Sequence, residues 1–290
     1  MMAQTTITVP LDVINTAPPK RYIQVGTGYS ADLTGFRGVP ANLTEKALCT
    51  ANTIRGQTAY ESFLRGEMSQ TEWGKTKRGL GKDTIFLSHK PLRHQINTLV
   101  GTNTTGQRMV IVDANNNHDF GDDRAFIYPL TLSQISKGAD GFYDNSIHAV
   151  MDTLPAVSAV VESVDNQRIV QRMVSVKPIP YNTGWTYPDP DKTRFHLSLL
   201  ANEYRQTTTL VLGKPIQVLV TTVPGQAYNT RSVTIELHEA GQPVNKLLSR
   251  GNYEPGYTFI LADHVLEIME LSLQGDKLTL LDKGLITPTH

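Results

Sequence analysis

The strongest constraint on the fold is an alternation of apolar and polar residues through the second half of the chain. Between Val157 and Lys283, short apolar runs of period two are separated by turn residues, which is typical of strands that bury one face. In residues 233–238, for example, Val, Ile and Leu alternate with Thr, Glu and His. The turn at residues 165–167 joins two such runs as a hairpin. This half therefore predicts an antiparallel sandwich or barrel.

The first half of the chain is less regular and predicts strands together with two short helices. Asn42 followed by Glu45 matches a helix N-cap with its capping-box partner. Four side chains then recur at helical spacing before Trp73: Tyr60, Phe63, Leu64 and Met68. We expect strands in four places: residues 5–14, 22–26, 84–88 and 109–112.

A segment rich in proline and turn residues divides the chain. We expect a mainly β protein with an antiparallel β-sandwich-like architecture, built from two β units, with one or two short helices in the N-terminal half. The predicted division has three parts: an N-terminal β-rich domain at 1–177 with the helices and an Asn/Asp-rich loop, a Pro-rich loop or linker at 178–193, and a C-terminal antiparallel β domain at 194–290.

Charge and cysteine content exclude several classes of protein. The 27 basic residues balance the 27 acidic ones, which argues against nucleic acid or an anionic membrane surface as a partner. No run of 18 apolar residues exists, so we expect no membrane span. The single cysteine, Cys49, excludes an internal disulfide, a CxxC redox pair and a thiolate zinc cluster. We expect Cys49 to be buried and inert.

The first residues bear on location. The stretch Met2–Thr6 resembles the start of a mature chain after a small-residue cleavage site, with an initiator Met in front. A single cysteine also suits an oxidising compartment, where unpaired thiols are hazards. We expect a secreted or periplasmic protein whose signal peptide is absent from this chain.

One loop carries metal-binding chemistry. Residues 113–123 place oxygen-bearing side chains at loop positions 1, 3, 5, 7, 10 and 11, between expected strands at 110–112 and 125–128. Alternating oxygen ligands in a tight loop can surround Ca²⁺. His118 and Arg124 stand where an EF-hand needs Gly and Glu, so the loop is not an EF-hand. The candidate ligands are Asp113, Asn115, Asn117, the Asp119 carbonyl, and Asp122 or Asp123.

A second interpretation of this loop stays open. Asn and Asp side chains also cap backbone amides in their own turn, and a loop that does so binds no ion.

The Pro-rich segment offers a second candidate site. Tyr181, Trp185 and Tyr187 could form an aromatic ligand platform, or they could pin the segment to the surface beneath it. The chain contains no GxSxG, HExxH, Walker or dinucleotide motif. We therefore assign no catalytic residue. A hydrolase would have to use Asp189 or Asp191 near Trp185 as its acid or base.

Two stretches, residues 83–88 and 107–123, stand out, and the second includes the Asn/Asp-rich loop. They resemble the β-rich N-terminal region of exported TlpA-like thiol-disulfide oxidoreductases, which often carry such a loop. Residues 257–264 and 273–284 resemble the strands that lead such proteins into their thioredoxin-fold domain. The match covers scattered pieces between Asp83 and Gly284. The sequence has no WCxxC motif and no thioredoxin-fold domain, so no redox residue is carried over.

We therefore expect a non-catalytic, extracytoplasmic β-rich binding or docking module with a structural calcium loop. The resemblance implies an accessory N-terminal part of a thiol-disulfide oxidoreductase system, with a protein partner or a missing thioredoxin-fold domain. Two alternatives stay open: a hydrolase with its site near Trp185, and a cell-surface adhesion or glycan-binding sandwich. The last would expose Trp185 and Tyr187 side by side.

Overall fold

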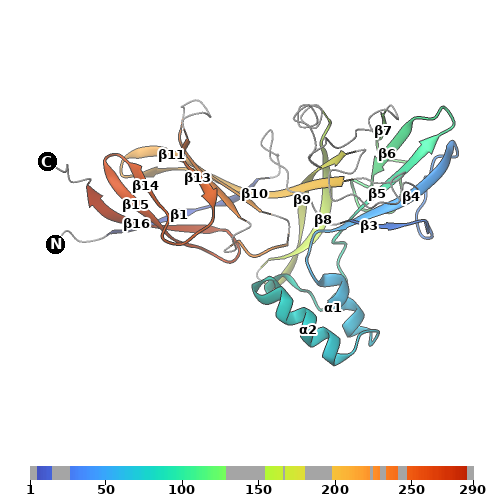
Figure 1. The fold of residues 1–290 in the computed structure, drawn as a ribbon, viewed down its shortest axis with the longest axis horizontal. Helices are drawn as coiled ribbons and strands as arrows, with labels where there is room; N and C mark the ends of the chain where they lie inside the picture. The colour runs from blue at the N-terminus through green and yellow to red at the C-terminus, as the bar shows by residue number, and fades with distance from the viewer. Residues whose placement is uncertain are drawn as a thin grey trace, which may run out of the picture. The chain divides into compact units, whose positions relative to one another are not determined.

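The computed structural model, drawn in Figure 1, describes most of the chain. The described residues are 5–14, 27–128, 154–165, 167–179, 198–222, 225–228, 233–240 and 247–285. The fold is mainly β with two α-helices and several antiparallel sheets, which confirms the predicted fold class. The chain forms two compact units. Unit 1 comprises Met1–Ala17, Leu80–Ile85 and Glu203–His290, and unit 2 comprises Pro18–Gly79 and Phe86–Asn202.

Unit 1 contains two sets of antiparallel strands. The first set has the order β1 (Thr5–Pro10), β16 (Lys277–Leu285), β15 (His264–Leu271) and β14 (Thr258–Leu261). The second set has the order β13 (Leu247–Asn252), β12 (Thr234–Glu239), β11 (Lys214–Thr222) and then the Glu203–Val211 part of β10 (Ser198–Val211). The short strand β2 (Asp12–Ile14) also pairs with β10.

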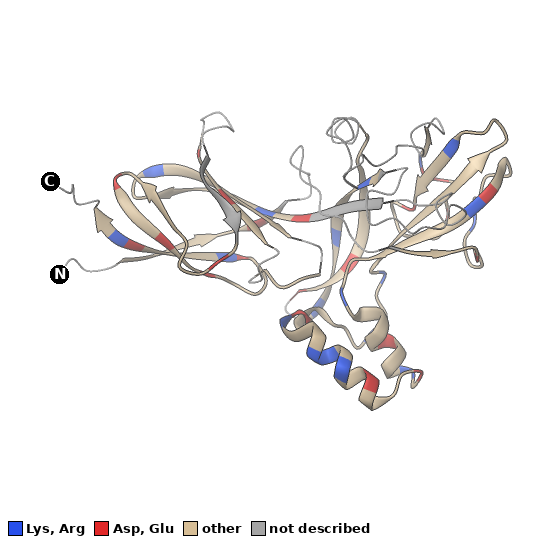
Figure 2. Ribbon diagram, in the orientation of Figure 1, with Lys and Arg blue, Asp and Glu red and all other residues tan. Residues whose placement is uncertain are grey.

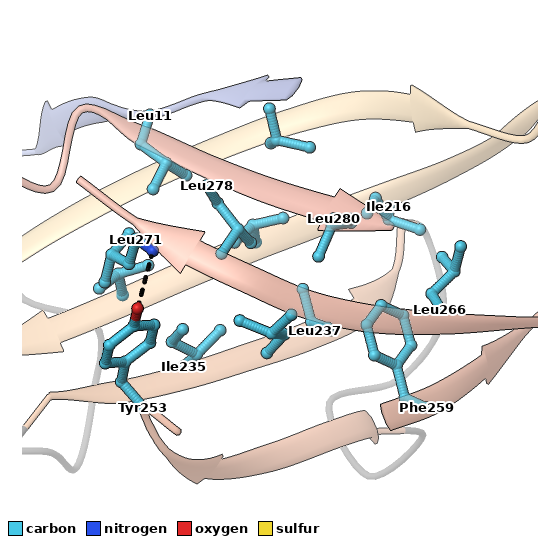
Figure 3. Close-up of a cluster of buried hydrophobic side chains, with 14 of the residues drawn as sticks. Leu11, Ile216, Ile235, Leu237, Tyr253, Phe259, Leu266, Leu271, Leu278 and Leu280 are labelled. Carbon is cyan, nitrogen blue, oxygen red and sulfur yellow. Dashed lines mark hydrogen bonds between the residues drawn. The ribbon is translucent and has the colours of Figure 1, made fainter. Parts of the chain in front are cut away.

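The core of unit 1 lies between these two sets of strands. Alternation along β11 turns Ile216, Val218 and Val220 inward, and none of the three is exposed. Figure 3 shows Ile216 among side chains of the other set of strands, which include Leu266 and Leu280. Burying an aliphatic side chain of this size contributes roughly 1.5 to 3 kcal/mol.

Unit 2 is built on a five-stranded antiparallel sheet. Its strand order is β3 (Thr27–Ser30), β4 (Leu43–Asn52), β5 (Gln95–Asn103), β6 (Arg108–Val112) and β7 (Ala125–Tyr128). A hairpin of β8 (Val157–Asp165) and β9 (Arg168–Ile179) completes the unit, and β9 pairs with Ser198–Asn202 of β10. The two strands pair antiparallel as far as Asp165 opposite Arg168, which confirms the predicted hairpin.

The helices of unit 2 follow β4. They are α1 (Gln57–Leu64) and α2 (Gln70–Leu80), and a 3₁₀ helix, η1 (Gly81–Phe86), comes next. The helical spacing of Tyr60 and Phe63 is explained by Trp73, because both rings stack on its indole at centroid distances of 4.9 and 5.6 Å. Among the described helices, none is both long enough and apolar enough to cross a membrane.

Two local predictions are wrong. Asn42 and Glu45 do not cap a helix, because β4 begins at Leu43 and pairs with β5 along its length. Pairing with a neighbouring strand overrides the local capping pattern. The strand expected at 84–88 overlaps η1 instead. There the Thr84 hydroxyl donates to the carbonyl of Gly81, a local bond that favours a turn.

The division into units differs from the predicted domain boundaries. β1 pairs with β16, so Thr5 lies opposite Asp282 and Pro10 opposite Lys277. The first strand therefore belongs to the sheet that contains the last strand. No local pattern encodes a partner some 270 residues away in the sequence. The strand expected at 22–26 and most of the linker expected at 178–193 lie outside the described residues.

Candidate functional site

The Asn/Asp-rich loop joins β6 to β7 in unit 2, between strands that match the predicted flanks. It begins at Asp113, directly after the buried strand β6, and the Asp113 side chain is almost fully buried. Its Oδ1 accepts the N–H of Asn117 at 3.0 Å, and its Oδ2 accepts the N–H of His118 at 3.1 Å. The carboxylate thereby fixes the first turn of the loop.

Three exposed side chains of the loop meet at one oxygen. The amide nitrogens of Asn115 and Asn117 donate to Oδ2 of Asp122 at 3.1 and 2.9 Å. The Oδ1 atoms of the same two amides accept the backbone N–H groups of Asn117 and Asp119. The predicted ligands Asn115, Asn117 and Asp122 are therefore neighbours in the structure.

Asp119 connects the loop to a preceding segment of the chain. Its Oδ1 accepts the N–H of Gly121 at 3.0 Å, and its Oδ2 lies 3.2 Å from the guanidinium of Arg37. The backbone of Arg37 is also bonded to the loop, because it donates to the carbonyl of His118 and accepts from the N–H of Phe120. The ring of Phe36 packs against the rings of His118 and Phe120.

Asp123 is the least satisfied carboxylate of the loop. Its Oδ1 accepts the N–H of Ala114 at 3.1 Å, but its buried Oδ2 has no hydrogen-bond partner in the described part of the chain. Burial raises the pKa of Asp123 to about 6; the Ala114 N–H opposes the rise, and the nearby carboxylates of Asp113, Asp122 and Asp119 add to it. Negative charge is therefore crowded at the end of the loop.

Two further contacts tie the loop to other parts of unit 2. Asn116 has a positive φ of 56° and is buried, and its side-chain nitrogen donates to the carbonyls of Arg93 and Gln95, each at 3.1 Å. The carbonyl of Ala114 accepts the N–H of Val160 in β8 at 2.7 Å. The loop is thus a junction between the five-stranded sheet, the segment before β5 and the β8–β9 hairpin.

The loop presents oxygen atoms of Asp and Asn side chains. In the described ranges, the loop included, no three His, Cys, Asp or Glu side chains form a metal-holding group. Calcium instead takes six to eight oxygens, which include Asn side chains, backbone carbonyls and water. The loop supplies the carboxylates, the Asn oxygens and one buried carboxylate oxygen without a partner. The same side chains also cap the loop backbone, as the second interpretation requires.

Of the candidate residues outside the loop, the structure describes Cys49 but not those of the Pro-rich segment. Cys49 is buried in β4, as expected. The aromatic platform of Tyr181, Trp185 and Tyr187, and the acid or base candidates Asp189 and Asp191, lie outside the described residues.

The sequence pattern did not indicate the segment that covers the loop. Phe36 and Arg37 lie about 80 residues before it and belong to no motif, so only the tertiary fold brings them to the site. Gly38 is part of the same contact: a Cβ there would overlap the backbone nitrogen of Gly121. A close approach of this kind leaves no periodic signal in a single sequence.

The fold and the site define a β-rich protein with a polar Asn/Asp-rich junction loop. In comparisons with known proteins, no family model, curated protein or solved structure matches the chain.

Proposed function

We propose that this chain is a non-catalytic, extracytoplasmic β-rich binding or docking module in which the loop at residues 113–123 binds Ca²⁺ as a structural ion. The observation that carries the proposal is the crowding of carboxylates in the loop, where the buried Oδ2 of Asp123 has no hydrogen-bond partner among the described residues.

Charge in the loop favours a divalent cation. Four carboxylates, those of Asp113, Asp119, Asp122 and Asp123, occupy eleven consecutive residues. Within the described ranges, one guanidinium, that of Arg37, lies at ion-pair distance from them. A cation among these oxygens would neutralise the repulsion and supply the partner that Asp123 lacks. Calcium tolerates irregular oxygen geometry, whereas Mg²⁺ requires a near-ideal octahedron.

The place of the loop in unit 2 supports a structural role for the ion. The loop is bonded to the carbonyls of Arg93 and Gln95, to Val160 of β8 and to Arg37. An ion that stiffens the loop would therefore stabilise four segments that are far apart in the sequence. Binding to the native state alone shifts the unfolding equilibrium by mass action.

The proposed location and partner follow from the resemblance to TlpA-like proteins. An accessory N-terminal part of such a system would be secreted or periplasmic and would dock a thioredoxin-fold domain or another protein. Calcium modules outside the cytoplasm bind with dissociation constants of roughly 10⁻⁴ to 10⁻³ M, so millimolar Ca²⁺ would occupy the loop.

Thermal unfolding with EDTA and with millimolar Ca²⁺ tests the calcium proposal. With a dissociation constant in this range, 1 mM Ca²⁺ should stabilise the fold by about 0.4 to 1.4 kcal/mol, which raises the melting temperature by roughly 1 to 5 °C. Asp122→Asn should abolish most of this rise, because it removes a ligand charge while keeping an acceptor for the two Asn amides. Asp12→Asn, a matched change at an exposed acid in β2, should leave the rise intact.

Identical melting curves in EDTA and Ca²⁺ would contradict the proposal and leave a self-capped turn. A rise that survives Asp122→Asn would place the ion elsewhere in the chain.

A further inference from the structure

An inserted helical segment separates two strands that need no long connection. β4 and β5 pair antiparallel from Leu43 opposite Asn103 to Asn52 opposite Gln95. Antiparallel neighbours are ordinarily joined by two to five residues. Here the chain instead inserts residues 53–94, which include α1 and α2, outside the five-stranded sheet (Figure 1). Insertions on a rigid scaffold are frequent sites of interaction.

The inserted helices are held in a fixed position. The side chain of Gln57 is fully buried; its nitrogen donates to the carbonyl of Ser88 at 3.0 Å, and its oxygen accepts the N–H of Ser88 at 2.9 Å. On the other side, Trp73 of α2 stacks on Tyr60 and Phe63 of α1. A surface that is rigid before binding loses less conformational entropy on binding.

The acidic side chains of these helices already have partners. Glu61 accepts from the Gln57 amide at 2.9 Å, and Glu67 pairs with Arg65 at 2.8 Å. Glu72 closes a capping box with Ser69 at the start of α2, where its Oε2 accepts both the N–H and the hydroxyl of Ser69.

The three cations of α2 have no ion-pair partner in the described part of the chain. Lys75, Lys77 and Arg78 are exposed, and none of them forms an ion pair within the described residues. Figure 2 shows the acidic residue at the beginning of α2 and the basic residues along the rest of it. The second half of α2 therefore carries three exposed cations and no acidic side chain.

We infer that the basic second half of α2, which carries Lys75, Lys77 and Arg78 around the helix, docks an acidic segment of a protein partner. The inference names a surface and a partner chemistry for the docking role proposed above, on which it rests, and it does not depend on the calcium loop. Unpaired exposed cations complement carboxylates and raise the rate of encounter with them.

The arrangement of the cations favours a peptide over a membrane or a nucleic acid. At 100° per residue, Lys77 lies 200° around the helix from Lys75, so the three cations cannot all face one flat surface. The one large aromatic side chain of α2, Trp73, is buried and unavailable to anchor a bilayer. The balanced net charge of the chain gives no broad basic surface for a nucleic acid. A flexible acidic chain can follow the curved surface of the helix.

Fluorescence anisotropy with a labelled polyglutamate peptide tests the inference on the full chain. The probe should bind at low salt and lose affinity as NaCl is raised. The triple variant Lys75→Glu, Lys77→Glu and Arg78→Glu should weaken binding by about tenfold or more. A matched control reverses three exposed lysines on strands: Lys46→Glu, Lys214→Glu and Lys277→Glu. Because both variants change the net charge equally, the control should bind within about twofold of the original chain.

Four outcomes would overturn the inference: no binding of the peptide, equal loss in both triple variants, loss in the control alone, or tighter binding of anionic phospholipid vesicles than of the peptide through the same three residues. Circular dichroism and melting temperature show whether each variant is folded. If the α2 triple variant unfolds, Lys75→Gln with Arg78→Gln should still weaken binding. Because the calcium test uses different residues and a different readout, failure here leaves the calcium proposal standing.

Discussion

Units 1 and 2 both contain a buried apolar cluster and buried polar bonds, but the apolar cluster is the larger in unit 1 and the polar bonds are the more numerous around the candidate loop and α1 of unit 2. In unit 1, two sets of strands press aliphatic side chains together, and Leu237, Leu266 and Leu280 have no exposed surface. In unit 2, buried polar side chains bond to the backbone of distant segments. Asp113 and Asn116 do so in the loop and Gln57 does so at the start of α1.

The difference indicates where each unit tolerates change. Apolar burial has no direction, so a core can repack around a substitution of similar volume. A buried polar bond requires one geometry, and removing one partner leaves the other unsatisfied at a cost of about 1 to 3 kcal/mol. The candidate calcium loop is held by buried polar hydrogen bonds, so a single substitution there should break a specific bond.

The largest effect is expected in the core of unit 1. Leu237→Ala should lower the free energy of unfolding by about 2 to 5 kcal/mol, because it removes buried methyl groups and leaves a cavity. Leu210→Ala, at a leucine that is 68% exposed, should cost under about 1 kcal/mol. Urea denaturation followed by circular dichroism measures both. Similar losses in the two variants would mean that apolar burial does not hold unit 1.

A smaller effect should separate two glycines of unit 2. Both have positive φ, +67° at Gly38 and +87° at Gly35, but only a Cβ at Gly38 would meet neighbouring atoms, those of Gly121 and Asp119. Gly35→Ala should therefore cost about 1 kcal/mol from backbone strain alone, and Gly38→Ala about 2 to 4 kcal/mol. Differential scanning calorimetry would compare them. Equal costs would show that the segment around Arg37 is not locked against the loop.

The smallest effect concerns the ion pair of Glu162 with Arg93. The backbone N–H of Arg93 holds the pKa of Glu162 below its ordinary value, against burial, and the Arg93 guanidinium adds to the lowering. A depressed pKa contributes stability above the pKa of the unfolded state, and this contribution is lost as pH falls through the folded pKa. Glu162→Gln should therefore cost up to about 1 kcal/mol near neutral pH and progressively less as the carboxyl becomes protonated. Urea titrations from about pH 7 to about pH 3 measure this, and a cost that grows in acid would contradict it.

Period-two patterns predicted the strands with one buried face. The runs at residues 157–164 and 216–220 lie in β8 and β11, and the flanks of the candidate loop lie in β6 and β7. β5 was missed because it is buried on both faces, so Gln95–Asn103 shows no alternation. The oxygen spacing located the loop itself. Asn116 and Arg37 could not be predicted, because their partners are distant in the sequence and follow no period.

The pairing of β1 with β16 has a consequence for the order of events during synthesis. The strand Thr5–Pro10 is made some 270 residues before its partner, Lys277–Leu285. At about 5 to 20 residues per second, β1 waits for tens of seconds with its hydrogen-bonding edge unpaired. Nearly all of unit 2 is made in the interval and can fold within it. The sheet of β1 and β16 therefore closes after unit 2 has been made, and β1 is the strand that a chaperone could shield for the longest time in that interval.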